Sequence, residues 1–146
     1  PHRDPVCAEL PTNIYESLSI KPKEILKSRD YVLVYENEDQ IKNIKIDKEL
    51  FDKKNIDPGG VVITAKGNNS DFVSRYFVPQ CSFFEDPVTG STHCSLVPYW
   101  SKKLGKQKLT SMQLSERGGE MFCIDKGDRV LINGKAKTYS VGEVFL

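Results

Sequence analysis

The segment from Glu85 to Cys94 is the feature of this 146-residue chain that most constrains its structure. It reads Glu-Asp-Pro-Val-Thr-Gly-Ser-Thr-His-Cys, and a mostly apolar run from Leu96 to Trp100 follows. A turn that leads into a helix leaves the N–H groups of the first helical turn unpaired, at the positive end of the helix dipole. We therefore expect an anion-binding turn here, with the chemistry of the chain beside it.

Most of the chain after Asp30 has the pattern of β-strands. Runs of β-branched and aromatic residues alternate with turn residues, such as those from Asp57 to Gly60. Asn133-Gly134 lies between two such runs and is a strong hairpin signal. The predicted strands are 31–35, a weaker alternation over Ile41, Ile44 and Ile46, then 60–64, 72–77, 109–114, 120–124, 129–132 and 135–139.

One substantial helix is predicted, over residues 91–104. Gly105 suits its C-terminus, and its apolar residues from Cys94 to Trp100 occur nearly all the way round, which is typical of an enclosed helix. Pro98 predicts a kink in it. Short helices are predicted to begin at Thr12 and Pro22 and to cover 47–53. Many strands around one enclosed helix indicate the α+β class with an antiparallel sheet.

The composition excludes several classes of partner. With 21 basic and 20 acidic residues the net charge is +1, too small to favour nucleic acid or an anionic membrane. No run is apolar enough to cross a bilayer, and the four cysteines are spread singly, as free thiols in a reducing compartment would be. We expect a cytoplasmic protein. No metal-ligand spacing or phosphate loop is present, so we predict no metal and no cofactor.

Three blocks, in this order, resemble the PhzF-like (phenazine biosynthesis-like) isomerases, relatives of diaminopimelate epimerase. They are Ser74–Pro79, Glu85–Cys94 and Gln113–Glu120. The resemblance implies the C-terminal half of a diaminopimelate epimerase-like fold, in which a curled, mostly antiparallel sheet wraps round one central helix in each half. The active site of that fold lies in the cleft between the halves. Residues 1–29 would then form short helices and a linker from an N-terminal half, and residues 30–146 the C-terminal domain.

The resemblance also implies the site residues. Spacing alone favours a turn or capping role for Asp86, whereas the aspartate at this point of the family motif is catalytic and helps to handle the substrate proton. The family turn binds the substrate carboxylate, which assigns that role to Gly90 and Ser91, and the N–H of Thr92 is exposed beside them. The main base of the family, a glutamate of the N-terminal half, has no matching segment here.

Five further residues are expected to support the site. Arg75 lies in an apolar strand and needs a partner, so a structural ion pair that holds the turn is favoured over contact with a substrate acid. We interpret His93 as a hydrogen-bonded core histidine more readily than as a proton relay. Arg117 and Gly118 resemble the family segment that lines the cleft floor, and the role of Glu85 stays open.

Together these features predict the C-terminal domain of a cofactor-independent isomerase, which moves a proton by acid–base catalysis on a small carboxylate-bearing substrate. The expected partners are that substrate, an N-terminal half of the same protein and further copies of the protein in a homo-oligomer. Without the main base, the chain alone should be inactive. The alternative is a non-catalytic binding or regulatory protein that retains the fold. The sequence upstream of Pro1 would discriminate between the two.

Overall fold

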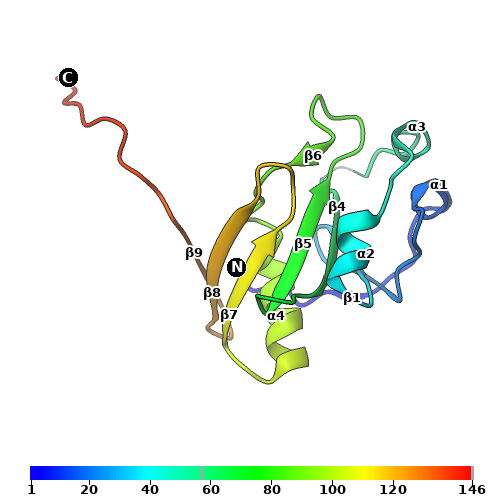
Figure 1. Ribbon diagram of the computed structural model, residues 1–146, viewed down its shortest axis with the longest axis horizontal. Helices are drawn as coiled ribbons and strands as arrows, with labels where there is room; N and C mark the ends of the chain where they lie inside the picture. The colour runs from blue at the N-terminus through cyan, green and yellow to red at the C-terminus, as the bar shows by residue number, and fades with distance from the viewer. Residues whose placement is uncertain (57, 146) are drawn as a thin grey trace.

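The computed structural model describes residues 1–56 and 58–145, which form one mixed β-sheet with helices on both faces (Figure 1). The strands are β1 (Val6–Cys7), β2 (Glu24–Lys27), β3 (Tyr31–Val34), β4 (Val61–Lys66), β5 (Phe72–Phe77), β6 (Glu85–Asp86), β7 (Lys108–Gln113), β8 (Gly119–Asp125) and β9 (Val130–Gly134). The helices are α1 (Thr12–Ser17), α2 (Glu38–Asn43), α3 (Lys48–Phe51) and α4 (His93–Leu104). Asp57, in one predicted turn, lies outside the described residues.

The sheet is mostly antiparallel. Its strands follow the order β1-β2-β3-β4-β5-β7-β8-β9, and the short strand β6 pairs with β5 beyond this path. The pairs β3 with β4 and β5 with β7 are parallel, and the remaining neighbours are antiparallel. The predicted fold class, α+β with a mostly antiparallel sheet, is therefore confirmed.

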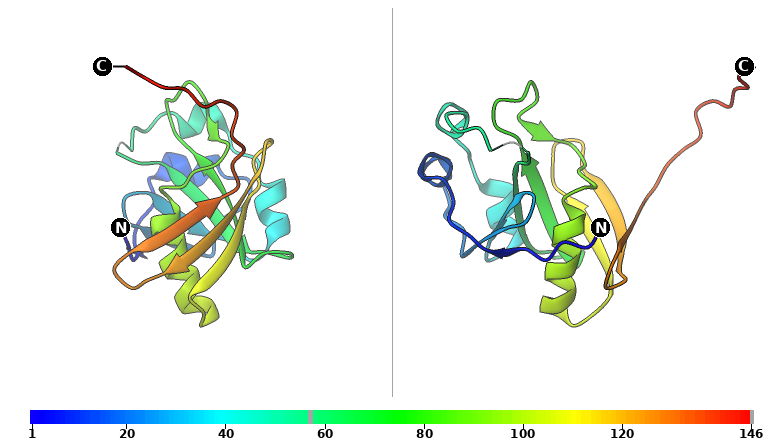
Figure 2. Two further views of the ribbon diagram at one scale, coloured as in Figure 1. Left: turned by 90° about the vertical axis from the view of Figure 1, so that its left-hand side faces the viewer. Right: turned by 180° about the vertical axis from the view of Figure 1, so that it is seen from behind.

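Two hydrophobic cores lie on opposite faces of this sheet. On one face, Leu96, Val97 and Trp100 of α4 pack against strand residues such as Phe72 and Tyr76. On the other face, α1, α2 and α3 contribute a second buried cluster, which includes Ile14, Ile41 and Phe51 together with Leu33 and Ile63 of the sheet. Figure 2 shows α4 and α2 separated by the sheet. The turn before α4 therefore lies on the face of the sheet that α4 covers.

Helix α4 runs unbroken from His93 to Leu104 with Pro98 inside it. A proline cannot donate to the carbonyl four residues earlier, which here belongs to Cys94. The N–H of Arg3 donates to that carbonyl instead, at 2.8 Å. Gly105 ends the helix in the left-handed conformation, with a φ of 66°. The predicted enclosed helix is confirmed, and the N-terminal segment compensates for the missing hydrogen bond.

Three local predictions are wrong. Residues after Pro22 form strand β2, because Glu24–Lys27 pair along β3. The weak alternation over Ile41, Ile44 and Ile46 lies partly in helix α2, which the Asn37 side chain caps by accepting from the N–H of Gln40.

The third wrong prediction is the Asn133-Gly134 hairpin. Both residues lie within β9, where Asn133 pairs with Phe122 and Gly134 with Met121 of β8. The turn that joins the two strands instead contains Gly127, at a φ of 86°. Residues 135–145 contain no strand and run away from the sheet (Figures 1 and 2).

Among residues 1–56 and 58–145, no helix has the length and apolar character that a membrane span requires.

Candidate functional site

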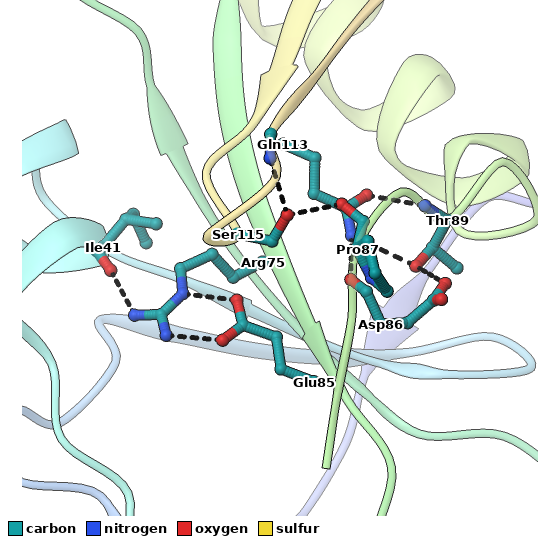
Figure 3. A network of polar contacts seen from close by, with 9 residues as sticks. Ile41, Arg75, Glu85, Asp86, Pro87, Thr89, Gln113 and Ser115 are labelled. Carbon is teal, nitrogen blue, oxygen red and sulfur yellow. Dashed lines mark hydrogen bonds and ion pairs between the residues drawn. The ribbon is translucent and has the colours of Figure 1, made fainter. Parts of the chain in front are cut away.

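The two acidic side chains of strand β6 point to opposite faces of the sheet. Glu85 pairs with Phe77 and Asp86 with Tyr76, which belong to the two different cores. Successive side chains of a strand alternate between faces, and Figure 3 shows Glu85 directed to Arg75 and Asp86 directed to Thr89. The two neighbouring acids therefore have separate surroundings and do not form a catalytic pair.

The predicted structural ion pair of Arg75 is confirmed, and its partner is Glu85. The guanidinium donates from Nε to Glu85 Oε1 at 2.7 Å and from Nη2 to Oε2 at 2.8 Å. Its Nη1 donates to the carbonyl of Ile41 in α2 at 3.2 Å. A two-pronged contact of this kind fixes orientation as well as distance. Arg75 thus joins its own strand β5 to β6 through Glu85 and to α2 through Ile41.

Removing this ion pair should destabilise the fold. In an Arg75→Met variant the partly buried Glu85 carboxylate loses two charge-assisted hydrogen bonds, and we expect the free energy of unfolding to fall by about 2 kcal/mol. Urea denaturation measures this. Lys23→Met is the matched control, because the Lys23–Glu36 pair is exposed and should contribute less than about 1 kcal/mol. Equal losses in the two variants would show that Arg75 does not hold the turn.

A buried glutamine holds the segment around Asp86. Gln113 in β7 is 1% exposed. Its Oε1 accepts from the N–H of Thr89 at 2.8 Å, and its Nε2 donates to the carbonyl of Asp86 at 2.7 Å. Thr89 in turn donates its hydroxyl proton to Asp86 Oδ2. Gln113 therefore fixes both ends of the Asp86–Thr89 turn. It begins the third block of the family resemblance, but the sequence alone did not indicate this role.

His93 is a fully buried histidine with a partner at each ring nitrogen. Nδ1 lies 3.0 Å from the carbonyl of Thr89, and Nε2 lies 2.9 Å from the hydroxyl of Ser111. Because a carbonyl only accepts, Nδ1 carries the proton and Nε2 accepts from Ser111. Burial lowers the pKa of His93 to about 4, although the bond to Thr89 opposes that shift. The interpretation of His93 as a hydrogen-bonded core residue is confirmed.

The turn before α4 leaves backbone donors unused. Gly90 and Ser91 are exposed, whereas Thr92 is only 1% exposed, so the expectation of an exposed N–H at Thr92 is wrong. Within the described part of the chain, no hydrogen bond uses the N–H of Gly90, Ser91 or Thr92. A Cβ built on Gly90 would meet no atom within 4 Å. The space in front of Gly90 is therefore open to a ligand or to another part of the protein.

The Ser115–Gly119 turn packs against Pro87 and Val88 of the Asp86–Thr89 turn. Ser115 donates its hydroxyl proton to the carbonyl of Pro87 at 2.6 Å and accepts from the N–H of Gly118 at 3.1 Å. Gly118 has a φ of 70°, a conformation that glycine adopts without strain. A Cβ on Gly119 would come within 2.4 Å of Val88 Cγ2, so the two turns are in close contact.

Arg117 is exposed at the tip of the same turn. Together with Glu85, Pro87, Ser115 and Glu116 it lines a cavity of about 430 Å³. The structure thus brings Glu85, Arg75 and Arg117 to one side of the Asp86 segment, and Asp86, Thr89 and His93 to the other. Among the described residues, no group of three or more His, Cys, Asp and Glu is placed to hold a metal ion.

Comparison with known proteins identifies the family. The family described as phenazine biosynthesis-like protein, PhzC-PhzF, matches residues 12–142. The chain belongs to this family. An uncharacterized isomerase of Pseudomonas aeruginosa is 40% identical over 146 residues, which are 100% of this chain and 56% of that protein. The chain therefore spans about half the length of the curated relatives that it matches.

Solved structures of PhzC-PhzF proteins have the same fold. A protein described as PhzC/PhzF from Clostridium difficile aligns with a TM-score of 0.85 and 40% identity, over 100% of this chain and 56% of that chain. A PhzF family protein from Enterococcus faecalis aligns with a TM-score of 0.86 and 37% identity, with the same coverage. The predicted diaminopimelate epimerase-like fold is thereby confirmed.

Proposed function

We propose that this chain supplies the assisting acid and the carboxylate-binding turn of a cofactor-independent isomerase, which transfers a proton on a small carboxylate-bearing substrate. One observation carries the proposal. The Asp86 carboxylate accepts from the Thr89 hydroxyl, and the exposed N–H groups of Gly90 and Ser91, which no hydrogen bond among the described residues uses, follow directly at the positive end of α4. A carboxylate bound by those N–H groups would place its neighbouring carbon close to Asp86.

The reaction needs a second acid–base group. A base removes a proton from the carbon next to an activating group, and an acid returns a proton to another face or another carbon. The family resemblance assigns the first role to a glutamate of the N-terminal half and leaves the second to Asp86. Base and acid are then restored by proton exchange with water. The proposal therefore includes an N-terminal half of the same protein as an obligatory partner.

Solvent exchange tests this function even while the substrate is unidentified. The intact protein is incubated in D2O with each of the standard L-amino acids, and proton NMR follows the loss of the Cα proton signal. We expect exchange with at least one amino acid. Binding of acetate at the turn without exchange of any amino acid would favour the non-catalytic binding protein.

The turn itself should bind carboxylates. In an NMR titration with sodium acetate, the N–H signals of Gly90 and Ser91 should shift most, because both residues are exposed and no group among the described residues accepts from their N–H groups. Gly90→Ala places a methyl group in the open space and should weaken acetate binding about fivefold, as expected when one hydrogen bond is lost. Gly134→Ala is the matched control, since a Cβ there also meets no atom within 4 Å. Shifts confined to residues 102–108 would refute an anion site at this turn.

A further inference from the structure

Every backbone and side-chain polar atom of Thr89 has a partner. Its N–H donates to Gln113 Oε1 at 2.8 Å, and its hydroxyl contacts both Gln113 and Asp86. Its carbonyl accepts from the Thr92 hydroxyl at 2.9 Å and from His93 Nδ1 at 3.0 Å. The residue is 6% exposed. Thr89 is therefore fixed in place independently of the contact that it makes with Asp86.

The direction of the hydrogen bonds around Thr89 follows from its neighbours. The N–H of Thr89 only donates and the carbonyl of Asp86 only accepts, so the Gln113 amide has a single consistent orientation. Its Nε2 then lies 3.2 Å from Thr89 Oγ1 and donates its second proton there. Because Nε2 cannot accept a hydrogen bond, the hydroxyl proton of Thr89 goes to its other partner, Asp86 Oδ2.

We propose that Thr89 is the positioning residue of Asp86, whose hydroxyl, oriented by Gln113, holds Oδ2 and leaves Oδ1 as the oxygen that exchanges a proton with the substrate. Among the described residues, no hydrogen bond uses Asp86 Oδ1. Oδ2 accepts from Thr89 whether Oδ1 is protonated or ionised, so in the chemical step the proton moves between Oδ1 and the substrate carbon, and exchange with water then restores Oδ1. Thr89 and Gln113 neither gain nor lose a proton. This inference rests on the proposed acid–base function of Asp86.

Crystal structures of variants of the intact protein test the positioning without a substrate. Thr89→Val keeps the shape of the side chain and removes the hydroxyl. We expect the Asp86 carboxylate to leave its position in this variant, while Gln113 and His93 still hold the main chain of the turn. Thr89→Ser restores the hydroxyl and should restore the carboxylate position. A Thr89→Val structure with the Asp86 side chain unmoved would overturn the proposal.

Kinetics in the exchange assay separate positioning from a purely structural role. Thr89→Val should lower kcat about tenfold or more with little change in KM, because the loss concerns orientation of the acid. Thr89→Ser should recover most of that loss. The matched control is Thr110→Val, which removes a hydroxyl that lies 3.2 Å from Asp71 Oδ2, outside the site. It should leave kcat unchanged.

A double-mutant cycle distinguishes this proposal from the function on which it rests. If Thr89 acts through Asp86, adding Thr89→Val to Asp86→Asn should lower kcat less than about twofold further. If Asp86→Asn alone leaves kcat unchanged, the acid–base function of Asp86 is wrong. If Asp86→Asn lowers kcat but Thr89→Val lowers it equally in both backgrounds, or not at all, only the positioning role is wrong.

Discussion

Replacing Asp86 with asparagine should lower the turnover of the intact protein by about 100-fold or more and leave its stability nearly unchanged. Asparagine has the shape of aspartate but cannot carry the transferred proton. The main-chain bond from Gln113 to the carbonyl of residue 86 does not depend on the side chain, so the turn should keep its conformation. Deuterium incorporation and thermal unfolding measure the two effects.

Glu85→Gln is the matched control, since it changes the neighbouring acid on the other face of the sheet. It weakens the contact with Arg75, and we expect a loss of stability of about 2 kcal/mol with turnover close to that of the parent. The opposite pattern, in which Asp86→Asn retains turnover but lowers the melting temperature by several degrees, would make Asp86 a structural turn residue.

The buried His93 should make the fold sensitive to mild acid. Its pKa is about 4 in the folded chain, against about 6.5 in an unfolded chain. As the pH falls below about 6.5 the unfolded state takes up a proton first, which favours unfolding. The stabilisation from neutral His93 is therefore complete above about pH 6.5 and is lost as the pH approaches 4, to a total of about 3 kcal/mol.

Comparison with His93→Asn isolates this contribution from that of the carboxylates. Asparagine can donate to the carbonyl of Thr89 and has no proton to gain, so the stability difference between parent and variant should shrink between pH 7 and pH 4.5. Urea denaturation at the two pH values measures it, with His2→Asn as the control on the other histidine. A difference that is constant with pH would show that His93 is not kept neutral by burial.

The sequence predicted those elements whose local signals agree with their tertiary surroundings. The run Phe72–Phe77 is β-branched and aromatic, and it forms strand β5 in the middle of the sheet. Gly105 ends α4 as its position suggested. Predictions failed where pairing decided the outcome. Pro22 is compatible with a helix start, but the ladder of Glu24–Lys27 with β3 makes that segment a strand.

The candidate site also contains residues that the sequence revealed and residues whose role only the fold revealed. The segment from Asp86 to Ser91 was recognisable because its residues are consecutive. Gln113 begins the third block of the family resemblance, but its role was not recognisable, because a polar residue in a strand gives no sign of its partner until the fold brings it to Thr89, 24 positions away in the chain. The alternation of Glu85 and Asp86 between faces required the pairing of β6 with β5, and two residues are too few for any periodicity to reveal a strand.

The short ladder between β5 and β6 also determines where this protein tolerates insertions. The pairs Phe77 with Glu85 and Tyr76 with Asp86 set the register, and the N–H of Val78 donates to the carbonyl of Phe84 at 3.0 Å just beyond them. Residues 81–83 lie in the loop beyond this last hydrogen bond, and Phe83 in that loop is 56% exposed. We therefore expect segments of different length to be tolerated at 81–83, while the acid at position 86 stays in register.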